Sequence, residues 1–531
     1  MALYLCAVDV GTASARAGIF DETGRLLGRA EHPILMLRPL PDHAEYDGED
    51  IWSAVSTATR GAVANAGVAP EEVVGLAFDA TCSLVARDAD GRPVSISTTG
   101  QNRWDTIAWL DHRAMREAEI ATATGHPLLD TLGGVVSPEM QTPKAMWLKR
   151  HLPHSWARIA LLFDLSDFLA WKATGSTERS LCTLATKWTF RADRPEGWSA
   201  DYLTAIGLDD LPQRGALPER GVPPGTDLGG LSETAASDLG LTTAVRVGAG
   251  FVDAYAGALA VLGPSAADPD LLERSAALIA GTSSCVMVAT RTPVRFAGCW
   301  GPALGTVFAD RWTSEGGQSA AGALLDHLLR WHSAGGEPTG DLHARVVARI
   351  GELRALHGES FAERLHILPD FRGNRSPLAD PRALGVISGL TMDTSFDDLC
   401  ALYWRAAVSL ALGIRHVLDA LAAAGRRIDV LHVTGGQTRN PLLVELYADV
   451  TGRRVVTPVE EGAMLRGAAM AAACAAGVWP SLTDAAAAMA DATCERSPDP
   501  DAERRYRVDY EIFLAMHEQR RHIDRLFDER L

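Results

Sequence analysis

The chain has 531 residues, of which 22% are charged and 47% are hydrophobic, a balance typical of a soluble enzyme with two domains. A net charge of −17 argues against nucleic acid as a main partner, since nucleic-acid-binding surfaces are rich in Lys and Arg. The eight cysteines are widely spaced without C-x-x-C pairs, which predicts reduced thiols in a cytoplasmic protein. The apolar N-terminus is too short for a signal peptide and the alanine-rich stretch 463–478 too short for a membrane span, so no membrane association is expected.

The first half of the chain alternates strand and helix patterns. Apolar runs predict strands, and residues 49–66 predict a helix because apolar side chains recur on one face. Residues 191–230 are rich in Pro and Gly and predict irregular structure around a short helix, while 263–270 is the expected linker. Strands are expected at 4–8, 17–20, 73–78, 84–86, 158–163 and 245–249, and helices at 49–66, 114–123, 143–151, 165–173 and 250–262.

The second half has a similar organisation, so we predict domains at 1–262 and 263–531. A loop-rich segment is expected up to residue 317, and the charged amphipathic tail at 500–527 is expected to cap the second domain. Strands are expected at 277–280, 285–289, 428–433 and 455–456, and helices at 318–333, 342–356, 399–424, 441–451 and 462–476.

Two segments share a glycine–hydroxyl pattern between apolar runs. Residues 9–14 read Asp-Val-Gly-Thr-Ala-Ser, and residues 280–284 read Ala-Gly-Thr-Ser-Ser. A strand–turn–strand of this kind directs backbone N–H groups and hydroxyls into one concavity that can hold phosphate oxygens. An ordinary tight hairpin with a solvated acid would explain the first segment alone, but two copies favour an internal duplication.

Five segments in order resemble the FGGY carbohydrate kinases of the actin-like ATPase superfamily, and the resemblance extends from about residue 3 to about residue 480. These segments are 9–12, 109–113 (Trp-Leu-Asp-His-Arg), 250–257, 280–284 and 433–441. The resemblance implies an α/β protein of two ribonuclease H-like domains with a cleft between them. The sugar is expected deep in the cleft, mainly on the first domain, and ATP across the second.

The resemblance also implies roles in phosphoryl transfer. Asp253 is the predicted general base, although it could instead cap the helix that follows it. Asp9 is expected to orient Mg²⁺ through water, although it could be a turn acid. The predicted ATP contacts are Gly11, Thr12, Ser14, Gly281, Thr282, Ser283, Gly435, Gly436, Gln437 and Asn440, the last of which could equally be a helix cap.

Residues 79–84, Asp-Ala-Thr-Cys-Ser-Leu, resemble D-ribulokinases most. The predicted reaction is therefore phosphorylation of the terminal hydroxyl of a pentulose, with D-ribulose as the first candidate substrate. Lys187 and Glu315 resemble sugar-contacting positions of D- and L-ribulokinases alike. Trp109 could be a core aromatic and Lys187 a surface charge. The predicted sugar contacts are Asp79, Thr81, Trp109, Asp111, Lys187 and Glu315.

Alternative hypotheses concern the substrate and the protein class. L-ribulose, xylulose or a polyol such as ribitol would be phosphorylated by the same reaction. A non-catalytic actin-like nucleotide-binding protein would share only the fold. Asp253, together with Trp109-Leu-Asp111, argues against the second alternative, because a binding module needs no base. The expected partners are a small sugar and ATP with Mg²⁺, and the resemblance suggests a homodimer.

Overall fold

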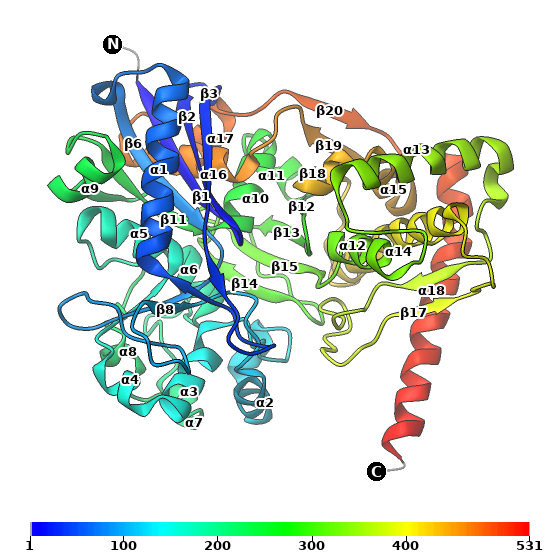
Figure 1. The fold of residues 1–531 in the computed structure, drawn as a ribbon, viewed down its shortest axis with the longest axis horizontal. Coiled ribbons are helices and arrows are strands. Elements are labelled where there is room, and N and C mark those ends of the chain that lie inside the picture. The colour runs from blue at the N-terminus through cyan, green and yellow to red at the C-terminus, as the bar shows by residue number, and fades with distance from the viewer. Residues whose placement is uncertain (1–2, 530–531) are drawn as a thin grey trace.

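Two mixed sheets form the frame of the protein, and the computed structural model describes residues 3–529 (Figure 1). The strand order is β10-β11-β6-β1-β2-β3 in the first sheet and β14-β15-β13-β12-β18-β19-β20 in the second. The first sheet comprises β1 (Tyr4–Val10), β2 (Ser14–Asp21), β3 (Leu26–Pro33), β6 (Val73–Ala80), β10 (Asp227–Gly230) and β11 (Arg246–Val252). The second comprises β12 (Ser275–Ala280), β13 (Ser284–Thr290), β14 (Trp300–Leu304), β15 (Trp312–Gln318), β18 (Val430–Thr434), β19 (Arg454–Pro458) and β20 (Thr493–Arg496).

The same pairing pattern occurs in both sheets. β1 is antiparallel to β2 and parallel to β6, which is parallel to β11. β12 is likewise antiparallel to β13 and parallel to β18, which is parallel to β19. β1 and β12 are almost wholly buried, as expected of central strands covered on both faces. The repeated order confirms the predicted fold of two related α/β halves.

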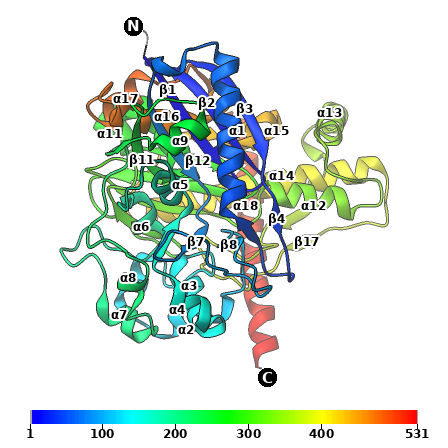
Figure 2. The ribbon, with the colours of Figure 1, turned by 60° about the vertical axis from the view of Figure 1, so that its left-hand side comes forward.

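Helices cover both sheets. α1 (Gly48–Ala66) lies along β2 and β3, as Figure 2 shows, and is capped by Asp47, whose side chain accepts hydrogen bonds from two backbone N–H groups. In the second half the central helix is α14 (Phe396–Ala423), which packs against its neighbours α12, α13 and α15. Of the helices within residues 3–529, only α14 is long and apolar enough to span a membrane, and most of it is buried in this core.

The remaining helices are short or flank the sheets. They are α2 (Met115–Ala123), α3 (Gln141–His151), α4 (Pro153–Arg158), α5 (Leu165–Thr174), α6 (Leu181–Lys187), α7 (Ala200–Ala205), α8 (Leu211–Arg214), α9 (Glu233–Leu239), α10 (Asp253–Ala266), α11 (Pro269–Leu272), α12 (Gly322–Trp331), α13 (Gly340–His357), α15 (Pro441–Thr451), α16 (Ala463–Ala475), α17 (Leu482–Ala488) and α18 (Pro500–Asp528). The 3₁₀ helices are η1 (Pro70–Glu72), η2 (Pro127–Thr131), η3 (Gly358–Ser360) and η4 (Gly436–Arg439).

Two helices join the halves. α10 follows β11 of the first sheet yet packs on β12, while α16 follows β19 of the second sheet and packs on β1, β6 and β11. Together they form one hydrophobic core with side chains of both sheets. The linker prediction at 263–270 was wrong for residues 263–266, which continue α10 although the small side chains and Pro264 suggested a turn. An exposed turn at 267–268 then leads into α11. The domain boundary at residue 262 stays a prediction.

The segment before residue 317 also differs from the expected loop. It contains β14 and β15, and β15 lies between β13 and β14. Its sequence, Trp-Thr-Ser-Glu-Gly-Gly-Gln, has no regular apolar pattern, so the strand exists through pairing rather than through local preference. Residues 191–230 contain two short helices, α7 and α8, in place of the one expected.

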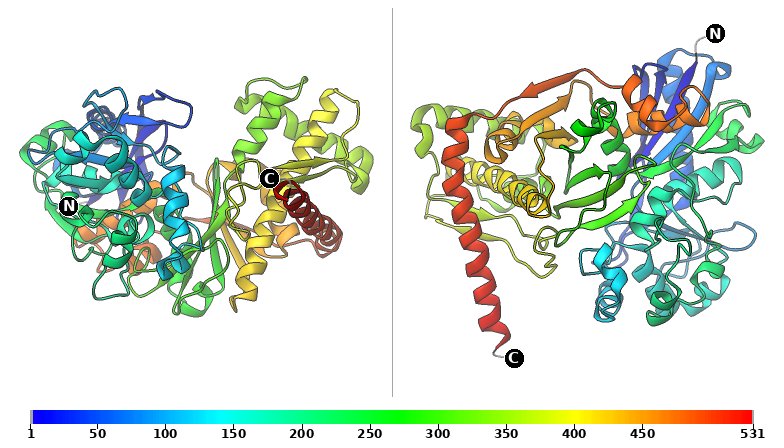
Figure 3. Two further views of the ribbon diagram at one scale, coloured as in Figure 1. Left: turned by 90° about the horizontal axis from the view of Figure 1, so that it is seen from below. Right: turned by 180° about the vertical axis from the view of Figure 1, so that it is seen from behind.

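Smaller elements complete the two halves. A third sheet, of order β4-β5-β8-β7-β9, extends the first half with β4 (Met36–Leu37), β5 (Glu45–Asp47), β7 (Leu84–Arg87), β8 (Trp104–Ile107) and β9 (Leu161–Asp164). The second half has the hairpin of β16 (His366–Leu368) and β17 (Val386–Ser388). The tail prediction is confirmed, since α18 packs on α15, β16 and α14, and its end projects past the body (Figure 3).

Candidate active site

An open cleft of about 940 Å³ lies between the two halves and is lined by side chains of both. Most residues that the sequence indicated as ligand contacts lie on its wall. These are Gly11, Thr12, Thr81, Trp109, Lys187, Asp253, Gly281, Thr282, Ser283, Glu315, Gly435, Gly436, Gln437 and Asn440. Four others do not line it, namely Asp9, Ser14, Asp79 and Asp111.

The two glycine–hydroxyl turns face the cleft. Each is closed by one backbone hydrogen bond, from the N–H of Gly11 to the Ser14 carbonyl at 3.0 Å and from the N–H of Gly281 to the Ser283 carbonyl at 2.9 Å. The Thr12 hydroxyl accepts a hydrogen bond from Trp109 Nε1 at 3.0 Å, so Trp109 is tied to the first turn. Both turns therefore present backbone and hydroxyl groups to a ligand.

Ser14 is placed differently from its prediction as an ATP contact. Its side chain is buried, and its hydroxyl donates to Glu31 Oε1 at 2.5 Å. The residue begins β2, where side chains alternate between the two faces of the sheet, and its hydroxyl is directed away from the cleft. The side chain thus stabilises the β2–β3 pair instead of binding phosphate.

A third loop, between β18 and α15, completes the second half of the cleft. Gly435 has φ +101°, and a Cβ there would lie 2.5 Å from the Ala280 carbonyl oxygen, so only glycine fits. Gln437 Nε2 donates to the Gly281 carbonyl at 2.6 Å and joins this loop to the second turn. Asn440 lines the cleft and also caps α15 by accepting from the Leu442 N–H at 3.1 Å, so the capping hypothesis is confirmed.

Three acids gather where the two sheets approach the cleft. Asp9 on β1 is the register partner of Asp79 on β6, and Asp253 begins α10. Asp9 Oδ2 pairs with Arg16 Nη1 at 3.0 Å. Asp79 is fully buried and neither of its carboxylate oxygens has a hydrogen-bond partner within the described chain. Burial, then the charges of Asp9 and Asp253, raise the pKa of Asp79 well above its ordinary value.

Asp253 is the acid that reaches the cleft itself. Its Oδ1 accepts the N–H of Ala254 at 2.7 Å, and the carboxylate faces the cavity. The capping hypothesis was wrong, because Asp253 is the first residue of α10 and Val252 holds the capping position without a side-chain hydrogen bond. Burial, reinforced by the negative charge of Asp9, raises the pKa of Asp253 to about 6. The side chain is therefore ionised at neutral pH but more basic than a solvated aspartate.

One end of the cleft is polar and aromatic. Thr81, Trp109, Lys187 and Glu315 all line it. Lys187 is buried and its Nζ lies 4.3 Å from the centre of the Trp300 ring, so the surface-charge hypothesis for Lys187 was wrong. Glu315 Oε2 accepts a hydrogen bond from the Tyr255 hydroxyl at 3.1 Å. Asp79 does not line this end.

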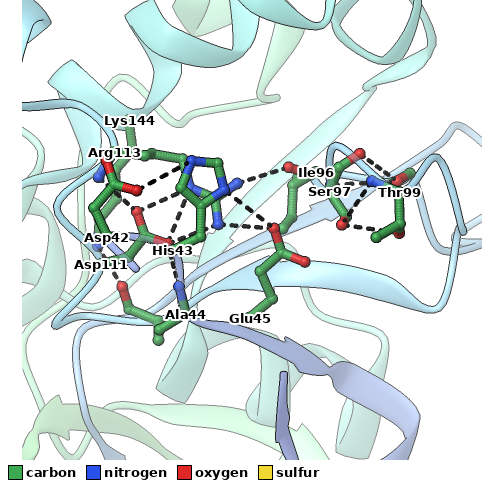
Figure 4. A network of polar contacts seen from close by, with 12 residues as sticks. Asp42, His43, Ala44, Glu45, Ile96, Ser97, Thr99, Asp111, Arg113 and Lys144 are labelled. Carbon is green, nitrogen blue, oxygen red and sulfur yellow. Dashed lines mark hydrogen bonds and ion pairs between the residues drawn. The ribbon is translucent and has the colours of Figure 1, made fainter. Parts of the chain in front are cut away.

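Asp111 does not contact the cleft, which corrects its prediction as a sugar ligand. Figure 4 shows it in a buried network in which Arg113 lies between Asp111 and Glu45. Asp111 also accepts the backbone N–H of Ala44 at 2.6 Å. The sequence places Asp111 next to Trp109, but the tertiary structure turns it toward Arg113, where it holds two chain segments together.

Sequence reasoning missed three cleft residues of the same end: Glu139, Trp300 and Arg375. Trp300 lies on the unpredicted β14, and Arg375 on the loop between β16 and β17. Burial alone would raise the pKa of Glu139, but His112 and Arg375 outweigh burial and lower it to about 2. No local pattern marks these residues, because they converge from three distant segments.

Comparisons with known proteins agree with this architecture. The model of the FGGY family of carbohydrate kinases matches the chain at residues 4–260 for its N-terminal domain and at 276–476 for its C-terminal domain. The protein is therefore a sugar kinase. It belongs to the FGGY family of carbohydrate kinases, and this resemblance, predicted from its motifs, is confirmed.

Relatives and solved structures extend the match over nearly the whole chain. An FGGY carbohydrate kinase domain-containing protein of Danio rerio is 40% identical over 545 aligned positions, covering 99% of each chain. D-ribulokinase of Saccharomyces cerevisiae is 34% identical over 514, covering 89% of this chain and 72% of that protein. A xyloylose kinase from Brucella ovis superposes with a TM-score of 0.81 at 23% identity, covering 98% and 100%, which shows a common fold.

Proposed function

We propose that this kinase transfers the γ-phosphoryl group of ATP to the terminal hydroxyl of a pentulose, converting D-ribulose to D-ribulose 5-phosphate. The observation that carries the proposal is the position of Asp253, which lines the cleft together with both glycine–hydroxyl turns and with the polar end at Lys187 and Glu315. The 34% identity to D-ribulokinase of Saccharomyces cerevisiae supports the choice of sugar.

Asp253 has the properties required of a general base. The reaction needs a group that takes the proton of the attacking hydroxyl and a fixed arrangement of the reacting atoms. The Ala254 N–H binds Oδ1 of Asp253, so Oδ2 is the oxygen that accepts the proton. A pKa of about 6 keeps the carboxylate ionised at neutral pH while increasing its affinity for that proton.

The residues of the second half fit ATP. Leu325, Val347 and Leu443 provide an apolar wall suited to a nucleobase, beside the Gly281 turn and the Gly435–Gly436 loop. A side chain at Gly436 would meet nothing within 4 Å, so a ligand can approach its backbone closely. The nucleotide would therefore extend from this wall to the two turns, with its phosphates toward Asp253.

The acid cluster fits a divalent cation bound largely through water. Asp79 is fully buried beside Asp9, and its oxygens accept no hydrogen bond from a donor group within the described chain, so a nearby cation would favour the ionised form of both carboxyl groups. Within residues 3–529 no three His, Cys, Asp or Glu side chains are arranged to ligate a metal directly, so the role of Asp9 stays a proposal. Mg²⁺ bound here would neutralise charge on the phosphates.

The test is ADP release with ATP and Mg²⁺ across a panel of pentuloses, pentitols, glycerol and hexoses, using wild type and Asp253→Ala. The highest kcat/KM for D-ribulose, lost in the variant, would support substrate and base. A higher value for L-ribulose, xylulose or ribitol would overturn the sugar assignment alone. ATP turnover that no sugar stimulates would overturn the acceptor class proposed here.

We also propose a cytoplasmic homodimer. All eight cysteines are unpaired, and five of them are buried, as suits a reducing compartment. Sedimentation of the purified protein tests the dimer, and fractionation of cells tests the location.

A further inference from the structure

Arg375 reaches the cleft from a loop that is remote in sequence from the other lining residues. Its two neighbours are held in place: Asn374 Nδ2 donates to Asp370 Oδ1 at 2.9 Å, and the Ser376 hydroxyl donates to the Gly298 carbonyl at 2.7 Å. The Arg375 side chain is only 10% exposed. The loop therefore presents a buried, positioned guanidinium to the cleft.

Carboxylates of both halves flank this guanidinium. Arg375 Nη2 lies 3.6 Å from Glu139 Oε2 of the first half, and Nη1 lies 3.6 Å from Glu315 Oε1 of the second. Both distances allow charge attraction but are too long for strong hydrogen bonds. Within the described chain its hydrogen bond goes to Cys285 Sγ at 3.6 Å, a weak acceptor, so most of its five N–H donors are available to a ligand.

Trp300 supports both cations of this end. The Arg375 guanidinium carbon lies 4.7 Å from the centre of the Trp300 ring, and Lys187 Nζ lies 4.3 Å from it. Cation–π attraction holds the two groups close despite their like charge. Two cations thus face two carboxylates, Glu139 and Glu315, and the formal charges of these four groups cancel, while the ionised Asp253 adds one negative charge beside them.

This balanced arrangement suits one chemical class of acceptor. Hydroxyl groups can accept from Arg375 and Lys187 and donate to Glu139 and Glu315. A sugar acid would bring a third carboxylate beside Glu139 and Glu315, and its repulsion would offset the attraction of the two cations. A neutral polyhydroxylated acceptor therefore satisfies more groups than a charged one.

We propose that Arg375, paired across the cleft with Glu139, is a specificity-determining residue that binds acceptor hydroxyls and selects neutral polyhydroxylated sugars over sugar acids. The proposal rests on the proposed function, since it takes this end of the cleft as the acceptor site. It adds a residue from the second half to a site expected mainly on the first.

The first test replaces Arg375 by Met and by Lys. Loss of hydrogen bonds from a charged donor should raise KM for D-ribulose about 10- to 100-fold in Arg375→Met, with KM for ATP within about threefold of wild type. Arg375→Lys should be intermediate, because it keeps the charge without the planar fork. Arg382→Met is the matched control: this exposed arginine lies seven residues on and pairs with Glu119 at 3.5 Å outside the cleft. An unchanged KM for D-ribulose in a folded Arg375→Met would overturn the proposal.

The second test concerns charge selection. Glu139→Gln removes one carboxylate and leaves the cations in excess, so D-ribonate should become a stronger competitive inhibitor against D-ribulose, by about tenfold relative to wild type. Inhibition is measured as a Ki, which requires no turnover of the acid. A Ki that stays at the wild-type value would refute selection by charge.

The wild-type panel separates this proposal from the proposed function. Should wild type prefer ribitol to D-ribulose, the assignment of D-ribulose fails, and the Arg375 variants are then measured with ribitol. Should wild type phosphorylate D-ribulose while Arg375→Met keeps its KM, the inference about Arg375 fails alone.

Discussion

Replacing Asp253 by Asn should abolish most activity while making the protein more stable. The amide keeps an oxygen for the Ala254 N–H, so the start of α10 is preserved. Loss of a general base costs about 10²- to 10⁴-fold in kcat. The variant also removes a carboxylate that is buried beside Asp9 and is therefore unfavourable in the folded state.

The expected gain in stability follows from the pKa. Folding raises the pKa of Asp253 from 3.8 to about 6, so the ionised side chain destabilises the folded state above pH 6. At about 1.4 kcal/mol for each pH unit, this destabilisation is about 3 kcal/mol at pH 8. It declines as the pH falls through 6, to roughly half at pH 5, because the folded protein then binds the proton.

The assay is urea unfolding of wild type and Asp253→Asn at pH 8 and pH 5, together with kcat at pH 8. The control is Asp501→Asn, which changes an exposed acid in the first turn of α18, far from the cleft, and should alter neither quantity. Equal stability of wild type and Asp253→Asn at pH 8 would refute the burial argument. A kcat within about threefold of wild type would refute the role as base.

Three further predictions concern the strand that leads to Asp253, the nucleotide loop and a buried histidine. In Gly250→Ala a Cβ would lie 2.1 Å from the Phe78 carbonyl oxygen, so the variant should lose about 1–3 kcal/mol in urea unfolding and displace the end of β11. Gln437→Leu should raise KM for ATP about tenfold without changing KM for the sugar, because the Gly281 carbonyl loses its donor. Burial lowers the pKa of His432 to about 4, so folding stability should fall as the pH drops from 6.5 to 4, and less so in His432→Gln.

Features encoded by neighbouring residues could be predicted from the sequence. The turns at Gly11 and Gly281 depend on glycine and hydroxyl residues within a few positions, and α14 depends on regular apolar spacing. Because these patterns are local, they also identified the family and the phosphate-facing loops. The position of Asp253 at the start of α10 was predictable for the same reason.

Other features depend on contacts between distant segments. β15 has a polar, glycine-rich sequence and is a strand because β13 and β14 pair with it. Asp111 is directed away from the cleft because the distant Ala44 N–H binds it, and its neighbour Arg113 is held by Glu45 of the same distant segment. Neither outcome has a signature within a short window of residues.

Short-range patterns of glycine, hydroxyl and apolar residues were enough to predict the class of protein, its two related halves and the loops expected to hold phosphate. They could not predict which polar side chains face the acceptor end of the cleft. Glu139, Glu315 and Arg375 meet there from separate segments, and their proximity depends on packing of the two halves around α10 and α16.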